Sequence, residues 1–294
     1  KKAVFEIGEV QITLLDTPGH VDFSAEMERT LQVLDYAVLV ISGADGVQGH
    51  TKTLWRLLDI YQIPVFIFVN KMDQIGTDKN KLIEDIKYQL DDGCIDFGQD
   101  ETAEFYEQLA MCDEIMMEAF LEIGHIEAGK IRKAVRERKV FPCFFGSALK
   151  LEGVEPFIQG IVKYAKIPSY PDKFGAKIFK VSRDEQGNRL THLKLTGGKL
   201  KVKDVLTNNI WEEKVNQIRI YSGGKFEAVN EIEAGSVCAV TGLSKARPGE
   251  GLGIEADLVT PVLEPVLFYR IILPDGCDPR AVIPKLRQIE EEEP

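Results

Sequence analysis

Residues 63–73 read IPVFIFVNKMD, an apolar run that ends in a short polar segment. The apolar part is rich in β-branched and aromatic residues, which is typical of a strand buried on both faces of a sheet. Similar runs lie at 10–15, 36–42 and 140–145. Helical patterns alternate with these runs, at 24–34, 50–61, 78–90, 104–121, 126–138 and 154–165. This alternation predicts an α/β domain, a parallel sheet with helices on both faces.

The pattern changes after residue 168. Short alternating runs over 174–262 are punctuated by turn pairs such as Gly187-Asn188 and Gly223-Gly224, which predicts an antiparallel β-barrel. We interpret 189–203 as a single hairpin turning at Gly197-Gly198, apolar on alternate positions with basic residues between. The predicted domains are therefore 1–168, 172–262 and a third segment, 263–294, that ends in a run of glutamates.

The composition limits the classes of function. The net charge is −11, which argues against a protein that coats nucleic acid through its overall field. Five cysteines without a Cys-x-x-Cys pair fit a reducing cytosol. Apolar runs of about five residues fall far short of the ~20 that a membrane-spanning helix needs. We expect a cytoplasmic protein without a membrane segment.

Three polar segments follow predicted strands: Asp16-Thr17-Pro18-Gly19-His20, Asn70-Lys71-Met72-Asp73 and Gly146-Ser147-Ala148. Ligands of open α/β sheets bind beyond the carboxyl ends of the strands, where all three segments fall. No Gly-x4-Gly-Lys-[Ser/Thr] phosphate loop occurs in the sequence, so we expect a fragment that lacks its own phosphate cradle.

The second polar segment has the residue types that recognise guanine. The Asp73 carboxylate can accept hydrogen bonds from the ring N1–H and the exocyclic amine, which adenine does not offer. Asn70 would bridge the base and neighbouring loops, and the Lys71 stem would lie along the base and ribose. The alternative is a polar turn that caps the next helix.

The third polar segment would bring backbone N–H groups to the guanine O6, because small residues at Ser147 and Ala148 allow a close approach. Taken alone it is a weak signal and is more typical of an ordinary turn at the end of a strand. Its interpretation depends on its order and position relative to the other two segments.

The first polar segment suits the phosphate end of a nucleotide. Asp16 can hold a water ligand of Mg²⁺, and Gly19 can offer its N–H to the terminal phosphate, so that loss of this phosphate releases the loop. His20 is placed to orient or polarise the attacking water. The alternative for an isolated histidine is a structural role.

Five stretches together resemble the elongation factor G branch of the translational GTPases: DTPGHVDF at 16–23, DGVQGHT at 45–51, the segments 70–73 and 146–148, and RLTHLKLTGGKLKVKD at 189–204. The resemblance covers about 1–262, with 263–294 resembling the linker and the opening of a third domain. It implies a P-loop NTPase type G domain, incomplete at its N-terminus, followed by a β-barrel. It implies GTP or GDP with Mg²⁺ as ligands and the ribosome, its RNA and proteins, as partner. It also implies that residues 16–20 belong to the second switch, with His20 catalytic.

Within this branch, the short interval 73–146 reads as helices only and looks more like the tetracycline-resistance ribosomal protection proteins than elongation factor G itself. We expect a monomeric GTP hydrolase for the intact protein and an inactive fragment. Translocation remains the alternative function, and a nucleotide-dependent binding module without turnover is the alternative for the fragment.

The basic residues of the predicted barrel hairpin allow two interpretations. Lys199, Lys201 and Lys203, with Arg189 and Lys194, can contact RNA phosphates, or they can keep a sheet edge charged and soluble. The sequence does not separate these alternatives.

Overall fold

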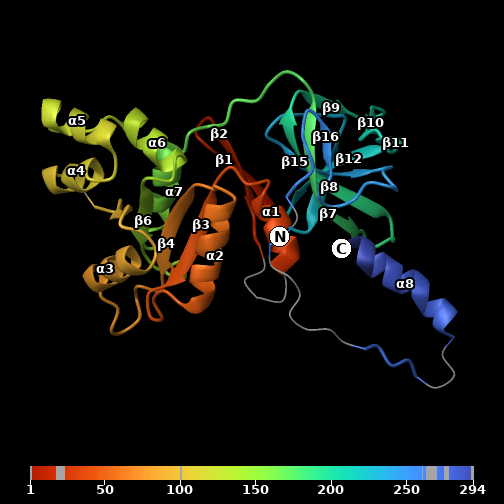
Figure 1. Cartoon of the computed structure of the whole chain (residues 1–294), viewed down its shortest axis with the longest axis horizontal. Coiled ribbons are helices and arrows are strands. Elements are labelled where there is room, and N and C mark those ends of the chain that lie inside the picture. Colours follow the sequence, from red (N-terminus) through yellow and green to blue (C-terminus); the bar gives the residue numbers. More distant parts are fainter. Residues whose placement is uncertain are drawn as a thin grey trace. The chain divides into compact units, whose positions relative to one another are not determined.

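The computed structural model describes residues 2–17, 24–99, 101–259, 261–262, 270–274 and 278–292. Contacts divide the chain into two compact units, one formed by 34–167 and the other by 1–33 together with 168–294. The sequence predicts instead that 1–168 form one domain, and those limits remain a prediction. Each unit is described by itself (Figure 1).

The unit 34–167 is built on a parallel sheet whose strand order is β3-β4-β6-β5. Three strands match the predicted runs, and a fourth of three residues was not predicted. The strands are β3 (Ala37–Ser42), β4 (Val65–Asn70), β5 (Cys94–Asp96) and β6 (Phe141–Phe145). Residues 65–69 of β4 are buried on both faces, as their unbroken apolar sequence predicts. The predicted α/β class is confirmed.

Six helices accompany this sheet in the described part of the unit (Figure 1). They are α2 (Gly49–Ile60), α3 (Lys79–Gln89), α4 (Ala103–Ala110), α5 (Glu114–Ile123), α6 (Ala128–Arg136) and α7 (Val154–Tyr164). The single helix predicted over 104–121 is wrong. The side chain of Asp113 accepts hydrogen bonds from Ile115 N and Met116 N, so it caps a new helix and divides the segment in two.

Among the described residues, the run at 10–15 is not hydrogen-bonded to a strand of the parallel sheet, which corrects the sequence interpretation. It forms β2 (Val10–Leu15), which pairs antiparallel with β1 (Lys2–Ile7), a strand that was not predicted. Only two residues separate the strands, and Gly8 has a φ of +59°. Two residues can close a hairpin, whereas a parallel crossover needs a dozen or more.

The other unit contains a mostly antiparallel β structure, as predicted, and its largest sheet has the order β13-β12-β15-β8-β7-β16. Between residues 175 and 253 this unit contains, in the large sheet and two smaller ones, the strands β7 (Gly175–Arg183), β8 (Arg189–Gly197), β9 (Lys199–Lys201), β10 (Val205–Thr207), β11 (Glu212–Lys214), β12 (Gln217–Ser222), β13 (Lys225–Val229), β14 (Glu231–Glu233), β15 (Val237–Thr241) and β16 (Gly251–Gly253). Ile178, Leu193, Leu195 and Trp211 are among its core residues.

The hairpin predicted over 189–203 is wrong. β8 pairs with β7 and β15, whereas β9 pairs with β14. A Cβ on Gly197 would lie 2.3 Å from the carbonyl oxygen of Lys173, and one on Gly198 would lie 2.8 Å from that of Asp172. These glycines therefore allow a close approach of the preceding chain segment rather than a tight reversal.

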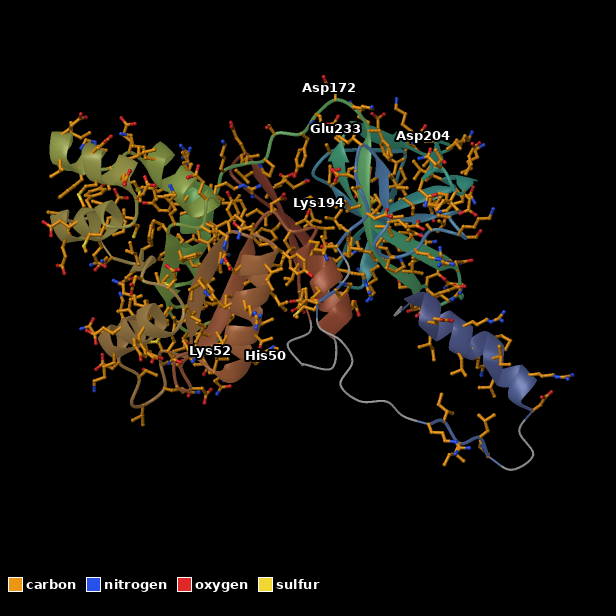
Figure 2. The ribbon with its side chains drawn as sticks, in the orientation of Figure 1. His50, Lys52, Asp172, Lys194, Asp204 and Glu233 are labelled. Atoms are coloured by element: carbon orange, nitrogen blue, oxygen red, sulfur yellow. The ribbon has the colours of Figure 1, made fainter. Side chains whose placement is uncertain are left out.

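The lysines of β9 form cross-strand ion pairs. Lys199 Nζ lies 2.7 Å from Glu233 and 3.5 Å from Glu231, and Lys201 Nζ lies 3.3 Å from Glu231. Lys194, on β8, is buried (Figure 2). The pairing favours the interpretation of a charged, soluble edge over that of an RNA contact at Lys199 and Lys201.

The β1–β2 hairpin is fastened to the barrel strands of the same unit. Lys2 Nζ lies 2.8 Å from His192 Nδ1, and Ser182 Oγ lies 2.7 Å from His192 Nε2. Because an ammonium group can only donate, Nδ1 accepts from Lys2 and the Nε2–H donates to Ser182. Glu26 of α1 (Ser24–Leu31) forms an ion pair with Lys180 of β7.

The last described element is α8 (Pro279–Glu292), which contacts β7. None of the helices within the described ranges combines the length and apolar character that crossing a bilayer requires.

Candidate functional site

Two of the predicted polar segments meet at the carboxyl ends of neighbouring strands. Val69 of β4 pairs with Phe145 of β6, and both strands run in the same direction. The side-chain Oδ1 of Asn70 accepts a hydrogen bond from Ala148 N at 2.8 Å and another from Lys71 N at 2.8 Å. The segments 70–73 and 146–148 therefore form one joined pair of loops.

Backbone hydrogen bonds strengthen this joint. Gly146 N donates to Val69 O at 2.9 Å, and Met72 N donates to Gly146 O at 3.0 Å. Lys71 has a φ of +64°, in the left-handed region that non-glycine residues rarely occupy. Such local strain persists only where surrounding contacts fix it, and here the Asn70 side chain and the Met72 bond do so.

Asp73 lies on the exposed side of these loops. A hydrogen bond from the Ser147 side chain lowers the pKa of Asp73, and the charge of Lys150 adds to this effect. Lys150 Nζ lies 3.7 Å from Asp73 Oδ2. The buried Ser147 hydroxyl accepts from Lys150 N at 3.3 Å, so it can donate its own proton to the carboxylate. Asp73 is therefore an oriented, ionised acceptor at neutral pH.

Two glycines let the loop after β6 fold tightly. A Cβ on Gly146 would lie 2.1 Å from the Glu152 carbonyl oxygen, and one on Gly153 would lie 2.3 Å from that of Phe145. Gly153 also has a φ of +72° and precedes α7. A side chain at either position would clash with the carbonyl group that faces it, at Glu152 or at Phe145, and would force this loop open.

The backbone N–H groups at 146–148 form hydrogen bonds within the protein. Gly146 N donates to Val69 O, Ser147 N to Glu152 O, and Ala148 N to Asn70 Oδ1. All three are used within the protein, so none is directed at a ligand in this arrangement. The contact of Ser147 and Ala148 with the guanine O6 remains a prediction.

The first polar segment is described only in part. Asp16 is exposed and Thr17 is half-buried, directly after β2. Pro18, Gly19 and His20 lie outside the described residues, so their predicted roles, including the catalytic role of His20, remain predictions. Asp16 likewise remains a predicted magnesium ligand through water.

Sequence reasoning missed the contribution of Lys150. Its side chain lies near Asp73, and its backbone N–H holds the Ser147 hydroxyl. The spacing of three residues from Ser147 is a usable signal, because a serine side chain commonly accepts from an N–H a few residues further along the chain.

Comparisons with known proteins agree with this architecture. A family model described as "Elongation factor Tu GTP binding domain" matches residues 1–167, and one described as "Elongation factor G domain 2" matches residues 173–252. The matched ranges correspond to the α/β part and the barrel part of the chain.

Individual relatives are similar over nearly the whole chain. Tetracycline resistance protein TetP of Clostridium perfringens is 33% identical over 319 residues, covering 99% of this chain and 49% of TetP. Elongation factor G 1 of Syntrophomonas wolfei is 30% identical over 341 residues, covering 92% of this chain and 50% of the relative. The chain thus spans about half the length of these curated relatives.

A solved structure has the same fold. The crystal structure of the protein ttk003000868 from Thermus thermophilus superimposes with a TM-score of 0.81 at 23% identity. The match covers 100% of this chain and 52% of that one, and at this identity it supports the fold alone.

Proposed function

The chain belongs to the GTP-binding domain family of elongation factor Tu, with a second domain of the elongation factor G type, and we propose that it is part of a ribosome-dependent GTPase of the ribosomal protection type. The observation that carries this proposal is the joined pair of loops at 70–73 and 146–148. They bring Asn70 and Asp73 to one edge of the sheet, held by the bond from Ala148 N to Asn70 Oδ1.

The loops suit a guanine base. Asp73 is ionised and exposed, so its carboxylate is available to the N1–H and the 2-amine of guanine. Since Asn70 Oδ1 already accepts two backbone N–H groups, its NH₂ group is the part that can donate to the base N7. Lys71 is exposed beside it, where its stem can cover the base and ribose.

The phosphate end of the nucleotide is assigned to residues 16–20. Asp16 would hold Mg²⁺ through a water molecule, which suits a cation that usually keeps several waters. Gly19 would contact the terminal phosphate, and His20 would position the attacking water. Thr17 and Pro18 would shape the loop that this phosphate orders.

Ribosomal protection is our preferred activity because of the interval between the two loops. Residues 74–145 fold as the helices α3 to α6 and two strands of the main sheet, without a separate subdomain in the described part. The relative TetP carries tetracycline resistance in its name, and similarity to it extends over 99% of this chain. Translocation of the elongation factor G type is the second candidate, favoured by the similarity at 30% identity to elongation factor G 1.

The test is cell-free protein synthesis blocked by tetracycline, with the product of the complete reading frame and GTP added. Restored synthesis is the expected result. A His20→Ala variant should keep its nucleotide affinity but hydrolyse GTP ~10²-fold more slowly, as loss of a proton-handling group usually causes. His125→Ala, which changes an exposed histidine, is the matched control.

Each other outcome points to a different function. No rescue from tetracycline, together with replacement of a depleted translocase in the same system, would move the assignment to elongation factor G. Binding of GTP and ribosomes without any turnover would identify a nucleotide-dependent binding module.

A further inference from the structure

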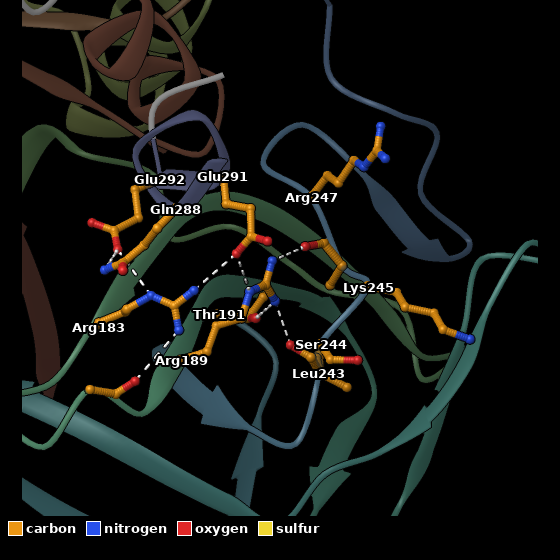
Figure 3. Close-up of polar contacts among 12 residues, drawn as sticks. Arg183, Arg189, Thr191, Leu243, Ser244, Lys245, Arg247, Gln288, Glu291 and Glu292 are labelled. Carbon is orange, nitrogen blue, oxygen red and sulfur yellow. Dashed lines mark hydrogen bonds and ion pairs between the residues drawn. The ribbon is translucent and has the colours of Figure 1, made fainter. Parts of the chain in front are cut away.

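Arg183 and Arg189 lie opposite each other at the end of the β7–β8 pair, where the two strands are in register (Figure 3). Burial and the neighbouring charge of Arg183 lower the pKa of Arg189, while Glu291 opposes this effect. Two guanidinium groups at such a position repel each other unless an anion lies between them.

Arg189 is oriented by the barrel itself. Its Nη1 donates to the carbonyl of Leu243, and its Nη2 donates to that of Ala246 at 2.5 Å. Nη1 also lies 3.3 Å from Thr191 Oγ1. Because these partners belong to the barrel, the guanidinium of Arg189 keeps its orientation whether or not α8 is in contact.

The anion between the two arginines comes from the last turn of α8. Glu291 Oε2 lies 3.1 Å from Arg183 Nη2 and 3.6 Å from Arg189 Nε, and Glu292 Oε1 lies 3.3 Å from Arg183 Nε (Figure 3). Carboxylates are disfavoured at a helix C-terminus, where the helix dipole is negative. These glutamates are therefore stabilised mainly by the arginines.

The fit of these carboxylates is incomplete. The Nε atoms of Arg183 and Arg189 are buried and have no hydrogen-bond acceptor in suitable geometry among the described residues. A tetrahedral phosphate has more acceptor oxygens than a carboxylate and suits the guanidinium fork. A cavity of about 390 Å³, lined in part by Arg183, Arg287 and Glu291, adjoins the contact.

We propose that Arg183 and Arg189 form a phosphate-binding site on the barrel, which the carboxylates of Glu291 and Glu292 occupy as an internal competitor. Lys245 and Arg247 lie on the loop whose Leu243 and Ala246 carbonyls hold Arg189, and their side chains point away from the two arginines (Figure 3). The phosphate can come from an RNA backbone or from free phosphate. RNA as the source rests on the proposed ribosomal function.

The test measures binding of a fluorescein-labelled RNA hairpin by anisotropy at fixed ionic strength, using the full chain. Glu291→Gln combined with Glu292→Gln should raise RNA affinity about threefold to tenfold, because the internal competitor is lost. The matched control is Glu212→Gln with Glu227→Gln, which changes the net charge equally at two exposed glutamates of the same unit. Arg183→Gln should lower affinity by a similar factor, and the exposed Arg56→Gln is its control.

The proposal is overturned if both double variants raise affinity equally, or if Arg183→Gln and Arg56→Gln behave alike. Competition by inorganic phosphate distinguishes the two sources: displacement of RNA by millimolar phosphate but not by chloride indicates a general phosphate site, and resistance to it indicates selection for RNA. Rescue of tetracycline-blocked synthesis by the complete protein tests the proposed function separately, so that the two ideas fail independently.

Discussion

Asp73 is the residue on which the choice of base depends. Its carboxylate accepts hydrogen bonds and is held ionised by the Ser147 side chain. Asp73→Asn replaces one acceptor oxygen by a donor, which suits the O2 carbonyl of xanthine rather than the guanine amine. We expect the preference to shift from GTP to xanthosine triphosphate in competition binding to the complete protein.

The control for this change is Asp92→Asn, which alters an exposed carboxylate elsewhere in the same unit. A retained preference for guanine in the Asp73 variant would remove this residue from the base-recognition site.

Gly153 carries a second prediction at the scale of the residue. Its φ of +72° and the 2.3 Å that would separate an added Cβ from the Phe145 oxygen make alanine strained there. We expect Gly153→Ala to lower the free energy of unfolding by about 2 kcal/mol or more. Gly129→Ala, in α6 with nothing near the added methyl group, should raise it by about 0.5 kcal/mol. Denaturant unfolding of both variants checks the pair, and equal effects would contradict the argument.

At the scale of elements, Glu101 joins α4 to α7. It contacts Lys163, accepts from Tyr106 at 2.7 Å and from Tyr164 at 2.9 Å, and these bonds lower its pKa to about 2. As the pH falls, the Glu101 carboxylate therefore binds its proton at a higher pH in the unfolded chain than in the folded one. The stabilisation is complete above about pH 4.5 and is lost as the pH approaches 2.

Glu101→Gln should consequently lower the free energy of unfolding at pH 7 by about 1 kcal/mol, a value discounted for the partial exposure of the group. The difference from the wild type should shrink as the pH falls from 4.5 towards 2. Urea unfolding across this range measures it, with the exposed Glu122→Gln as control. A difference that does not depend on pH would show that the carboxylate charge is not involved.

The contact of the β1–β2 hairpin with the barrel strands should respond to pH in the neutral range. Burial, with the charges of Lys2 and Lys180, lowers the pKa of His192 well below 6.5. Below about pH 6.5 the unfolded state therefore binds a proton that the folded state rejects, and stability falls. His192→Gln should flatten this dependence between pH 7 and 5. Thermal unfolding measures it, and the exposed His125→Gln should retain the wild-type slope.

The elements also show what sequence patterns can establish. The runs at 36–42, 63–69 and 140–145 were predicted because they are continuously apolar, as strands buried on both faces are. Burial on both faces holds for β4 and β6, whereas Val38 and Val40 of β3 are exposed. The strand β5 was missed because three residues carry no periodicity. The run at 10–15 was recognised as a strand, but its partner was not, since propensity does not determine pairing.

At the scale of the molecule, a guanine nucleotide should stabilise the complete protein by mass action. GDP at 100 times its dissociation constant should add about 2.7 kcal/mol to the free energy of unfolding of the unit that holds the site. Hydrogen exchange should slow at 70–73 and 146–148, whereas ATP should leave these amides unchanged. Equal protection by ATP would exclude selective recognition of guanine.

Part of the candidate site could be predicted from the sequence, and part could not. Asn70, Asp73, Ser147 and Ala148 were predicted to lie together because parallel strands end at one edge, and the structure brings them together. The part played by Lys150 and the contact of Glu291 with Arg183 were not predicted. Both contacts join side chains from different loops or from segments more than a hundred residues apart in the sequence, and no local sequence pattern indicates such a contact.

One oxygen atom, Asn70 Oδ1, receives the N–H groups of both Lys71 and Ala148. This oxygen joins the two loops in addition to the backbone hydrogen bonds at Gly146, so a displacement of either loop is transmitted directly to the other. Fluctuations at Lys71 and Ala148 should therefore be correlated rather than independent. The two loops would then close on a bound base together, as one unit, rather than in two separate steps.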